Sequence, residues 1–302
     1  MYESFFAFER SPFNNVPDTS FFFPSSAHGE ALAQLSYAVS ARRGFAVLTG
    51  EVGAGKTTLT RALFRKLDPR TVTAVVTNSR FTGVQLLLAV AKEFGIDDVK
   101  PNRVDLLDRI NKFLIARLAE DRNVVLLIDE AQDLPLATLE EVRLISNLET
   151  ESEKLIQILL VGQPELRAAI DHPSLKQLRQ RIAFRFHLGP LDEAQTKEYV
   201  LHRLRIAGPL NTAKFTDKAL EAVYRYSGGV PRLINLACDK ALFVGFTDGE
   251  RRIDQKTVLA GIREIEGPDW NFKSKSELAA EQGDAAPRRP FLRLPFFGGR
   301  TT

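Results

Sequence analysis

The chain has 302 residues, of which 44% are hydrophobic and 26% are charged, and its formal net charge at pH 7 is +3. This length allows more than one domain, and the composition excludes a disordered or fibrous protein. The net charge is too small to indicate a nucleic-acid-binding protein by itself. The single cysteine, Cys238, excludes an internal disulfide and favours a reducing compartment.

No apolar run approaches the ~18 residues needed to span a bilayer. The first residues also lack the basic region and apolar core of a signal peptide. We therefore expect a cytoplasmic protein without a transmembrane segment, whose contact with a membrane would be peripheral.

Residues 1–26 are rich in phenylalanine and proline. The proline density argues against a long helix, so we expect this segment to pack on the base domain that follows and to bury its rings there. Two roles are open for the rings: ordinary core packing, or part of an apolar wall for adenine. A helix is expected over 27–43. His28 in its first turn is by default a solvated or capping side chain, and the alternative is a contact to adenine or to a partner.

Residues 45–58 predict a buried strand, a glycine-rich turn and the start of a helix. Gly50, Gly55, Lys56 and Thr57 match the phosphate-loop pattern G-x-x-x-x-G-K-[ST]. Glycines let the backbone wrap around phosphate oxygens, and the N-terminus of the helix adds its positive dipole end. We expect Lys56 to reach the β- and γ-phosphates and the Thr57 hydroxyl to ligate Mg²⁺. A chance glycine-rich turn is the alternative, and the apolar strand before the turn disfavours it.

Residues 123–130 contain the second informative pattern. The apolar run 124–128 predicts a central strand of a parallel sheet, buried on both faces. Asp129 and Glu130 follow at its carboxyl end, where open α/β sheets bind ligands. Asp129 is placed to hold Mg²⁺, and Glu130 to orient and polarise an attacking water. A pair of solvated acids would be the simpler interpretation if the phosphate loop were absent.

Polar and basic residues follow or precede the other predicted strands, 71–77, 155–161 and 183–188. Asn78 follows the first, and Gln163 follows the second, where it can contact a γ-phosphate or the lytic water. Three arginines accompany the third strand: Arg179, Arg181 and Arg185. Such a group is usually a solvated face, and the alternative is projection into the nucleotide of a neighbouring subunit.

Helices account for the remaining predicted elements. Before Gly189 they are expected over 56–67, 82–94, 103–119, 138–149 and 165–180. After Asp192 the strand signals stop, and helices are expected over 192–206, 216–226, 231–246 and 254–265. Arg232 lies one residue after Pro231 at a helix start and could point back at a phosphate.

Residues 267–302 lose helical periodicity, and their end combines arginines with large apolar residues. A disordered tail is the simpler interpretation. The alternatives are a docking peptide for a partner, which we prefer slightly, and a weak anchor to an anionic membrane surface.

These motifs together resemble an AAA+ ATPase over residues 1 to about 266. Within that superfamily the chain is similar to the ExeA/GspA-like family, general secretion pathway protein A. The strings that carry the resemblance are Gly44-Phe45, Thr49-Gly50-Glu51-Val52-Gly53, Asp129-Glu130-Ala131-Gln132 and Leu160-Val161-Gly162-Gln163-Pro164-Glu165-Leu166.

The resemblance implies an α/β fold: a P-loop AAA+ domain with a parallel sheet in an α/β/α sandwich, followed by a small all-helical lid. The expected divisions are an N-terminal segment at 1–26, the nucleotide-binding domain at 27–190, the lid at 191–266 and the tail at 267–302.

The resemblance also implies roles for individual residues. The Walker A loop would comprise Gly50, Glu51, Val52, Gly53, Ala54, Gly55, Lys56, Thr57 and Thr58. Asp129 and Glu130 would be the Walker B pair, Gln163 sensor 1 and Arg232 sensor 2. Arg181 is the preferred arginine finger acting in trans, with Arg179 and Arg185 as rivals. Asn78 would restrain Glu130 until a ligand binds.

An ATPase that uses ATP and Mg²⁺ is therefore expected, acting as a homo-oligomer on an envelope-associated secretion, pilus or polysaccharide-export system. The tail could dock that partner, and the inner-membrane surface is a possible location. Longer members of the family continue into a transmembrane helix and a peptidoglycan-binding domain, which this sequence lacks, so direct cell-wall binding is in doubt. The same core also resembles ATP-dependent, DNA-binding regulators of Tn7-like transposition, which the charge balance disfavours. A third alternative is a switch that binds nucleotide with negligible hydrolysis.

Overall fold

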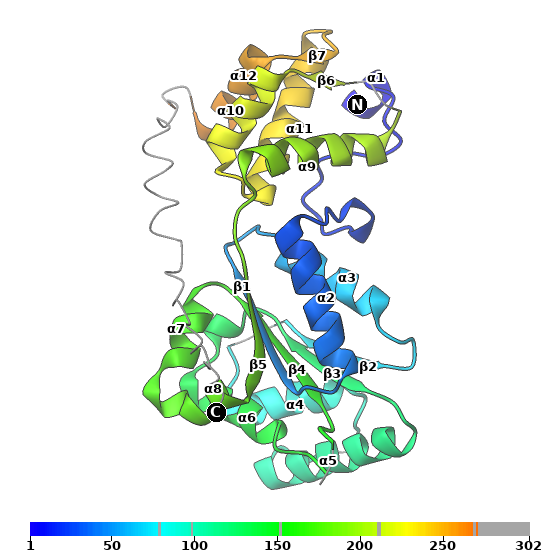
Figure 1. Cartoon of the computed structure of the whole chain (residues 1–302), viewed down its shortest axis with the longest axis vertical. Coiled ribbons are helices and arrows are strands. Elements are labelled where there is room, and N and C mark those ends of the chain that lie inside the picture. The colour runs from blue at the N-terminus through cyan, green and yellow to red at the C-terminus, as the bar shows by residue number, and fades with distance from the viewer. Residues whose placement is uncertain (78–79, 98, 151–152, 210–212, 268–269, 271–302) are drawn as a thin grey trace, which may run out of the picture.

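A computed structural model describes residues 1–77, 80–97, 99–150, 153–209, 213–267 and 270. The described chain forms a parallel sheet with helices on both faces and, beyond one end of that sheet, a second group of helices that also carries the N-terminus (Figure 1). Asn78 and residues 271–302 of the tail lie outside the described residues. None of the described helices is long and apolar enough to cross a membrane.

All five strands of the sheet run parallel, in the order β2-β3-β4-β1-β5. They are β1 (Phe45–Gly50), β2 (Val72–Val76), β3 (Val124–Ile128), β4 (Gln157–Gly162) and β5 (Ile182–Leu188). Every residue of β1, β3 and β4 is buried, which is why these segments are continuous apolar runs in the sequence. The edge strand β5 alternates instead between exposed and less exposed residues. The carboxyl ends of the strands all meet at one edge of the sheet.

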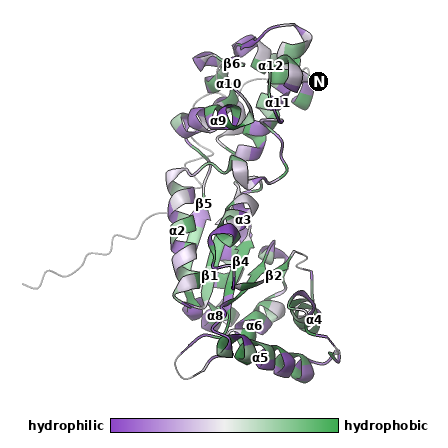
Figure 2. Ribbon diagram, turned by 90° about the vertical axis from the view of Figure 1, so that its right-hand side faces the viewer, coloured by the Kyte–Doolittle hydropathy of each residue, from purple (hydrophilic) through white to green (hydrophobic). Residues whose placement is uncertain are grey.

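Each face of the sheet forms its own hydrophobic core. Alternate strand residues such as Leu48 and Leu127 pack with α2 (Ser26–Ser40) and α3 (Lys56–Lys66) on one face. Residues that point the other way, such as Val47 and Leu126, pack with the helices of the opposite face. Those helices are α4 (Gly83–Glu93), α5 (Arg103–Ala119), α6 (Leu136–Ile145), α7 (Glu165–Asp171) and α8 (Lys176–Arg181). Figure 2 shows the hydrophobic strands between these two layers. The parallel α/β/α architecture predicted from the sequence is confirmed.

The chain after β5 is mainly helical. It contains α9 (Glu193–Ala207), α10 (Asp217–Ser227), α11 (Pro231–Thr247) and α12 (Gln255–Glu266). Asp192, Thr216 and Asp254 cap three of these helices with their side chains. The expectation that strands end before Asp192 was wrong, because β6 (Lys214–Phe215) and β7 (Arg252–Ile253) form a short parallel pair. Strands of two residues carry too little periodicity to be read from a sequence.

The N-terminal segment packs mostly with these later helices, whereas we expected it on the base, which it contacts through Phe22 and through the Pro17 carbonyl that accepts from Arg61 of α3. It contains α1 (Tyr2–Phe5) and the 3-10 turn η1 (Thr19–Phe21). Its buried rings share one core with α9, α10, α11 and α12: Tyr2, Phe6, Phe8, Phe13 and Phe21. The chain therefore passes from this helical part to the sheet before α2 and returns after β5, so two covalent connections join the two parts (Figure 1).

Candidate active site

The loop between β1 and α3 is wound around the side chain of Lys56. Gly53 and Gly55 have left-handed backbone conformations, with φ of +82° and +95°. The Lys56 ammonium is almost buried and donates hydrogen bonds to the carbonyls of Gly50 (2.7 Å) and Glu51 (3.0 Å). Burial lowers the pKa of Lys56, and the nearby carboxylates of Glu130 and Asp129 oppose that shift. The loop thus presents a cation and the N-terminus of α3 at one place.

His28 holds the same loop from α2, and it is buried rather than solvated. Its Nε2 lies 3.1 Å from the carbonyl oxygen of Ala54. Because a carbonyl only accepts, Nε2 carries the proton, and Nδ1 accepts from the Ser25 hydroxyl at 2.7 Å. Burial lowers the pKa of His28, which favours this neutral form. A Cβ on Gly55 would lie 3.0 Å from Nε2, so the glycine permits this contact.

The two acids after β3 stand at the same edge of the sheet as this loop. Asp129 accepts a hydrogen bond from the Glu130 N–H at 3.0 Å. Burial raises the pKa of Asp129, the charge of Glu130 adds to the rise, and Lys56 opposes it. Glu130 has a left-handed backbone (φ +50°), and its Oε2 accepts from Nε2 of Gln132 at 2.9 Å. This conformation turns the chain sharply, so Glu130 faces the cavity beside the loop.

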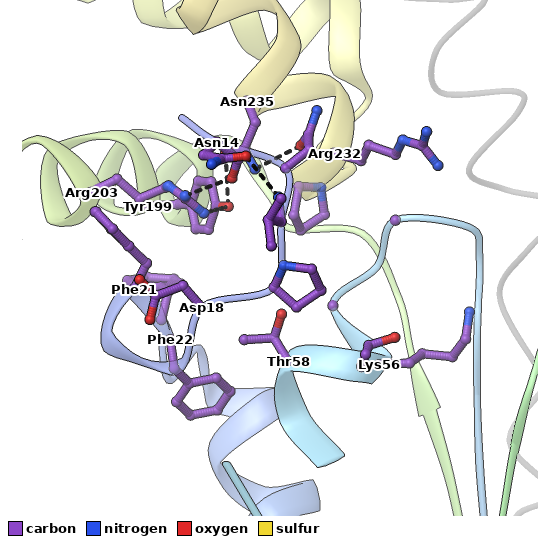
Figure 3. Close-up of a pocket in the computed structure, with 18 of the residues that line it drawn as sticks. Asn14, Asp18, Phe21, Phe22, Lys56, Thr58, Tyr199, Arg203, Arg232 and Asn235 are labelled. Carbon is purple, nitrogen blue, oxygen red and sulfur yellow. Dashed lines mark hydrogen bonds between the residues drawn. The ribbon is translucent and has the colours of Figure 1, made fainter. Parts of the chain in front are cut away.

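A cavity of about 380 Å³ lies between the loop, the N-terminal segment and the lid helices (Figure 3). The loop side is lined by residues 52–53 and 55–58 together with Glu130. The N-terminal segment contributes residues 14–18 and the rings of 21–23, and the helices contribute Tyr199, Arg203, Arg232 and Asn235. Ligand sites are usually a few hundred Å³ in volume, and this cavity has that size; it combines apolar rings with many polar and charged groups, which suits a polar ligand.

A chain of polar side chains forms the end of the cavity away from the loop, and the sequence analysis missed it. Arg203 is almost buried, its guanidinium lies 4.6 Å from the centre of the Phe21 ring, and it donates to the Tyr199 hydroxyl at 2.9 Å. The Tyr199 hydroxyl donates to Asn235, whose amide nitrogen donates to Asn15 at 3.1 Å. The sequence did contain a signal for this pair: an arginine follows a tyrosine by four residues within the apolar face of a predicted helix.

The helical part of the chain touches the loop between β1 and α3 directly through the start of α11. The Arg232 N–H donates to the Gly53 carbonyl at 3.3 Å, and a Cβ on Gly53 would lie 2.4 Å from the Arg232 Cβ. Figure 3 draws the Arg232 side chain extending away from Asn14 and Asn235. Just before α11, the carbonyl of Gly229 accepts from the N–H of Leu191 at 2.9 Å. The turn before α11 therefore contacts both the phosphate loop and the connection from the sheet.

The other predicted site residues are distributed more widely. Gln163 follows β4 at the same sheet edge as Glu130, and its N–H donates to Oε1 of Gln132 at 2.9 Å. Arg181 is half-buried and donates to the Ser146 carbonyl, whereas Arg185 pairs with Asp171 at 3.3 Å.

Arg179 is exposed at the end of α8. The register Phe45↔Ile182 and Gly50↔Leu188 puts the start of β5 at the end of the sheet opposite the phosphate loop. None of the three arginines lines the cavity of its own chain.

The donor set near the loop fits Mg²⁺. Among the described residues, no three His, Cys, Asp or Glu side chains form a cluster that could hold a metal alone. Mg²⁺ is usually held by one or two protein oxygens together with substrate phosphates and water. Thr57 and Asp129 offer a hydroxyl and a carboxylate of this kind at the cavity and next to it.

Comparisons with known proteins support the resemblance found in the sequence. Residues 39–170 match a family model described as an AAA domain. General secretion pathway protein A of Aeromonas hydrophila is 43% identical over 268 residues, which cover 88% of this chain and 49% of that protein. The chain therefore contains an AAA domain, and it is similar to general secretion pathway protein A over most of its own length. It spans about half the length of that curated relative.

Solved structures agree with this AAA+ fold. The ORC2 protein of Aeropyrum pernix superposes with a TM-score of 0.65 at 16% identity, over 90% of this chain and 75% of that one. Cdc6p of Pyrobaculum aerophilum gives 0.61 at 19% identity, over 82% and 71%. The RuvB motor of Thermotoga maritima gives 0.53 at 20% identity, over 84% and 81%. At such identities the similarity establishes the fold alone.

Proposed function

We propose that this AAA+ chain binds ATP with Mg²⁺ and hydrolyses it at the edge of the sheet where β1 and β3 end. The observation that carries the proposal is that the Lys56 loop and Glu130 line one cavity, with Asp129 next to Glu130 and close enough to Lys56 to affect its pKa. The loop N–H groups and the start of α3 would hold the phosphates, and Lys56 would leave the loop carbonyls for the β- and γ-phosphates. Thr57 and Asp129 would hold the metal, which neutralises phosphate charge when it is bound.

Glu130 would orient the attacking water and accept its proton, because its carboxylate faces the cavity. Gln163 would contact the γ-phosphate from the end of β4. The apolar rings at 21–23 and the polar groups around Asn235 would contact the adenosine. Of the two roles left open for the N-terminal rings, we thus propose the apolar wall for adenine. Arg232 would sense the nucleotide from α11, and Asn78 would restrain Glu130.

The proposal about the partner assembly rests on similarity to a known protein. A protein 43% identical to this chain is named general secretion pathway protein A, which supports work on an envelope-associated assembly. Oligomerisation is supported by the location of Arg179, Arg181 and Arg185, which lie far from the cavity of their own chain and could complete that of a neighbour. We expect such an assembly to act in the cytoplasm, at or near the inner membrane.

Replacing Glu130 by Gln tests the catalytic assignment. The isosteric amide keeps the shape of the site but cannot accept the proton, so ATP should bind with wild-type affinity while turnover falls at least about 100-fold. Binding is measured by titration calorimetry and turnover by phosphate release. Glu93→Gln, at an exposed acid on α4, is the control and should behave as wild type. Unchanged steady-state hydrolysis in Glu130→Gln would refute the assignment.

A further inference from the structure

The short turn after β3 contains a side chain that joins two parts of the proposed site. Gln132 lies in the 3-10 turn η2 (Ala131–Asp133), two residues after Glu130. Its Nε2 donates to Oε2 of Glu130, and its Oε1 accepts from the N–H of Gln163, each at 2.9 Å. One amide group therefore connects the acid after β3 to the backbone at the end of the neighbouring strand β4.

The orientation of this amide is fixed by its partners. A carboxylate only accepts, so the group that faces Glu130 must be the NH₂. A backbone N–H only donates, so the group that faces Gln163 must be the oxygen. Reversal of the Gln132 amide would break both hydrogen bonds together, and each partner thereby holds the amide in place for the other.

The backbone of β4 is shaped to receive this side chain. Gly162 is the last residue of β4, and a Cβ there would lie 2.6 Å from Oε1 of Gln132. The same Cβ would lie 3.0 Å from Leu166 of α7. Only glycine leaves room for the Gln132 amide to reach the Gln163 N–H, so the contact depends on two positions of the chain.

We propose that Gln132 is a positioning residue that ties the carboxylate of Glu130 to the backbone of Gln163. The inference rests on the proposed ATPase function and deepens it. A carboxylate held at one oxygen keeps the other oxygen free for water. The orientation of the Glu130 carboxylate then depends on the position of the end of β4. Movement of Gln163 on contact with a γ-phosphate would pass through the Gln132 amide to the general base.

Two substitutions separate the two halves of the contact. Gln132→Leu removes both hydrogen bonds, whereas Gln132→Glu keeps an acceptor for Gln163 but cannot donate to Glu130 when ionised. Turnover should fall about tenfold in both variants, because the base is misdirected rather than removed, and ATP affinity should stay within about twofold of wild type. The Gln163 amide should exchange with deuterium about fivefold faster in Gln132→Leu and at the wild-type rate in Gln132→Glu.

The matched control is Gln34→Leu, which removes an equivalent hydrogen bond of 2.8 Å from Gln34 to Glu30 on the exposed face of α2. It should change neither turnover nor exchange at Gln163. A Gln132→Leu change made in the Glu130→Gln background should lower turnover by less than about twofold further, because Gln132 acts only through the base.

Several results would overturn the inference. They are wild-type turnover in either Gln132 variant, unaltered Gln163 exchange in Gln132→Leu, or a full additional tenfold loss in the Glu130→Gln background. Any of these in a protein whose wild type hydrolyses ATP leaves the proposed function standing and removes the inference alone. A wild-type protein without turnover would remove both.

Discussion

Lys56 and His28 hold the phosphate loop from two sides, and both do so through carbonyl oxygens of the loop. The lysine was predicted from the sequence pattern, because G-x-x-x-x-G-K-[ST] specifies it by spacing. The role of His28 was not, because nothing in the sequence indicates which carbonyl a buried imidazole reaches. Gln132 and Arg203 were missed for a similar reason, since each also has a partner on a distant segment: Gln163 for Gln132 and Pro12 for Arg203.

The histidine makes a pH-dependent contribution that can be measured. The pKa of His28 is lowered by burial, so the unfolded chain takes up this proton more readily than the folded one. Its stabilising contribution is complete above the unfolded pKa of about 6.5 and is lost as the pH falls below it. His28→Gln, which can still donate to Ala54, should show a smaller fall in melting temperature between pH 7.5 and 5.5 than wild type. Exposed His172→Gln is the control. Identical pH profiles for wild type and His28→Gln would contradict this role.

If the loop binds nucleotide as proposed, Gly53 links that binding to the start of α11, because its missing side chain leaves room for Arg232. In Gly53→Ala the new Cβ would meet the Arg232 Cβ at 2.4 Å, in addition to the strain at φ +82°. We expect ATP affinity to fall at least about fivefold, from a cost of roughly 1–3 kcal/mol at the loop. Gly95→Ala has similar backbone strain (φ +68°) but open space around its Cβ. This control should lose stability only, and equal ATP affinities in the two variants would argue against the contact.

At the scale of elements, how well a segment could be predicted from the sequence depends on how it is buried. The strands β1, β3 and β4 were predicted because burial on both faces requires unbroken apolar runs. The rings of the N-terminal segment also predicted burial, but their local pattern does not specify which core receives them. Long-range groups decided this, among them Arg203, which donates to the carbonyls of Pro12 and Asn14.

Arg203→Met should release the N-terminal segment from α9. Loss of hydrogen bonds from a charged donor, with the methionine still filling the apolar volume, should lower the free energy of unfolding by about 1.5–3 kcal/mol. Limited proteolysis should then cut near residues 10–20 faster than in wild type. Arg205→Met, at an exposed arginine on the same helix, is the control. Equal cleavage rates would show that the segment is held by its rings alone.

At the scale of the whole molecule, the cavity lies where two parts of the chain meet. The sheet contributes the phosphate loop and the acids, while the N-terminal segment and α9 to α12 contribute the opposite wall. Two covalent connections and the Gly53–Arg232 contact join the parts, so we expect nucleotide turnover to change the angle between them.

The proposed assembly leads to a complementation test. If an arginine near the start of β5 acts on a neighbour, one of Arg179→Ala, Arg181→Ala and Arg185→Ala should lower turnover at least about tenfold without loss of ATP affinity. Mixing that inactive variant with inactive Glu130→Gln should restore turnover, because mixed assemblies contain sites with an intact base and an intact arginine. A trans arginine would be excluded if wild-type turnover did not depend on protein concentration and no mixture of the variants recovered turnover.

The central claim is that a nucleotide lies between the Gly53 turn and the acids after β3. A crystal structure of Glu130→Gln with ATP and Mg²⁺ tests it most directly. We predict that the phosphates contact the N–H groups of 53–58 and Lys56, that the metal lies between Thr57 and Asp129, and that adenine lies among the rings at 21–23. A triphosphate bound elsewhere, or one that leaves the Lys56 ammonium on the loop carbonyls, would contradict the account.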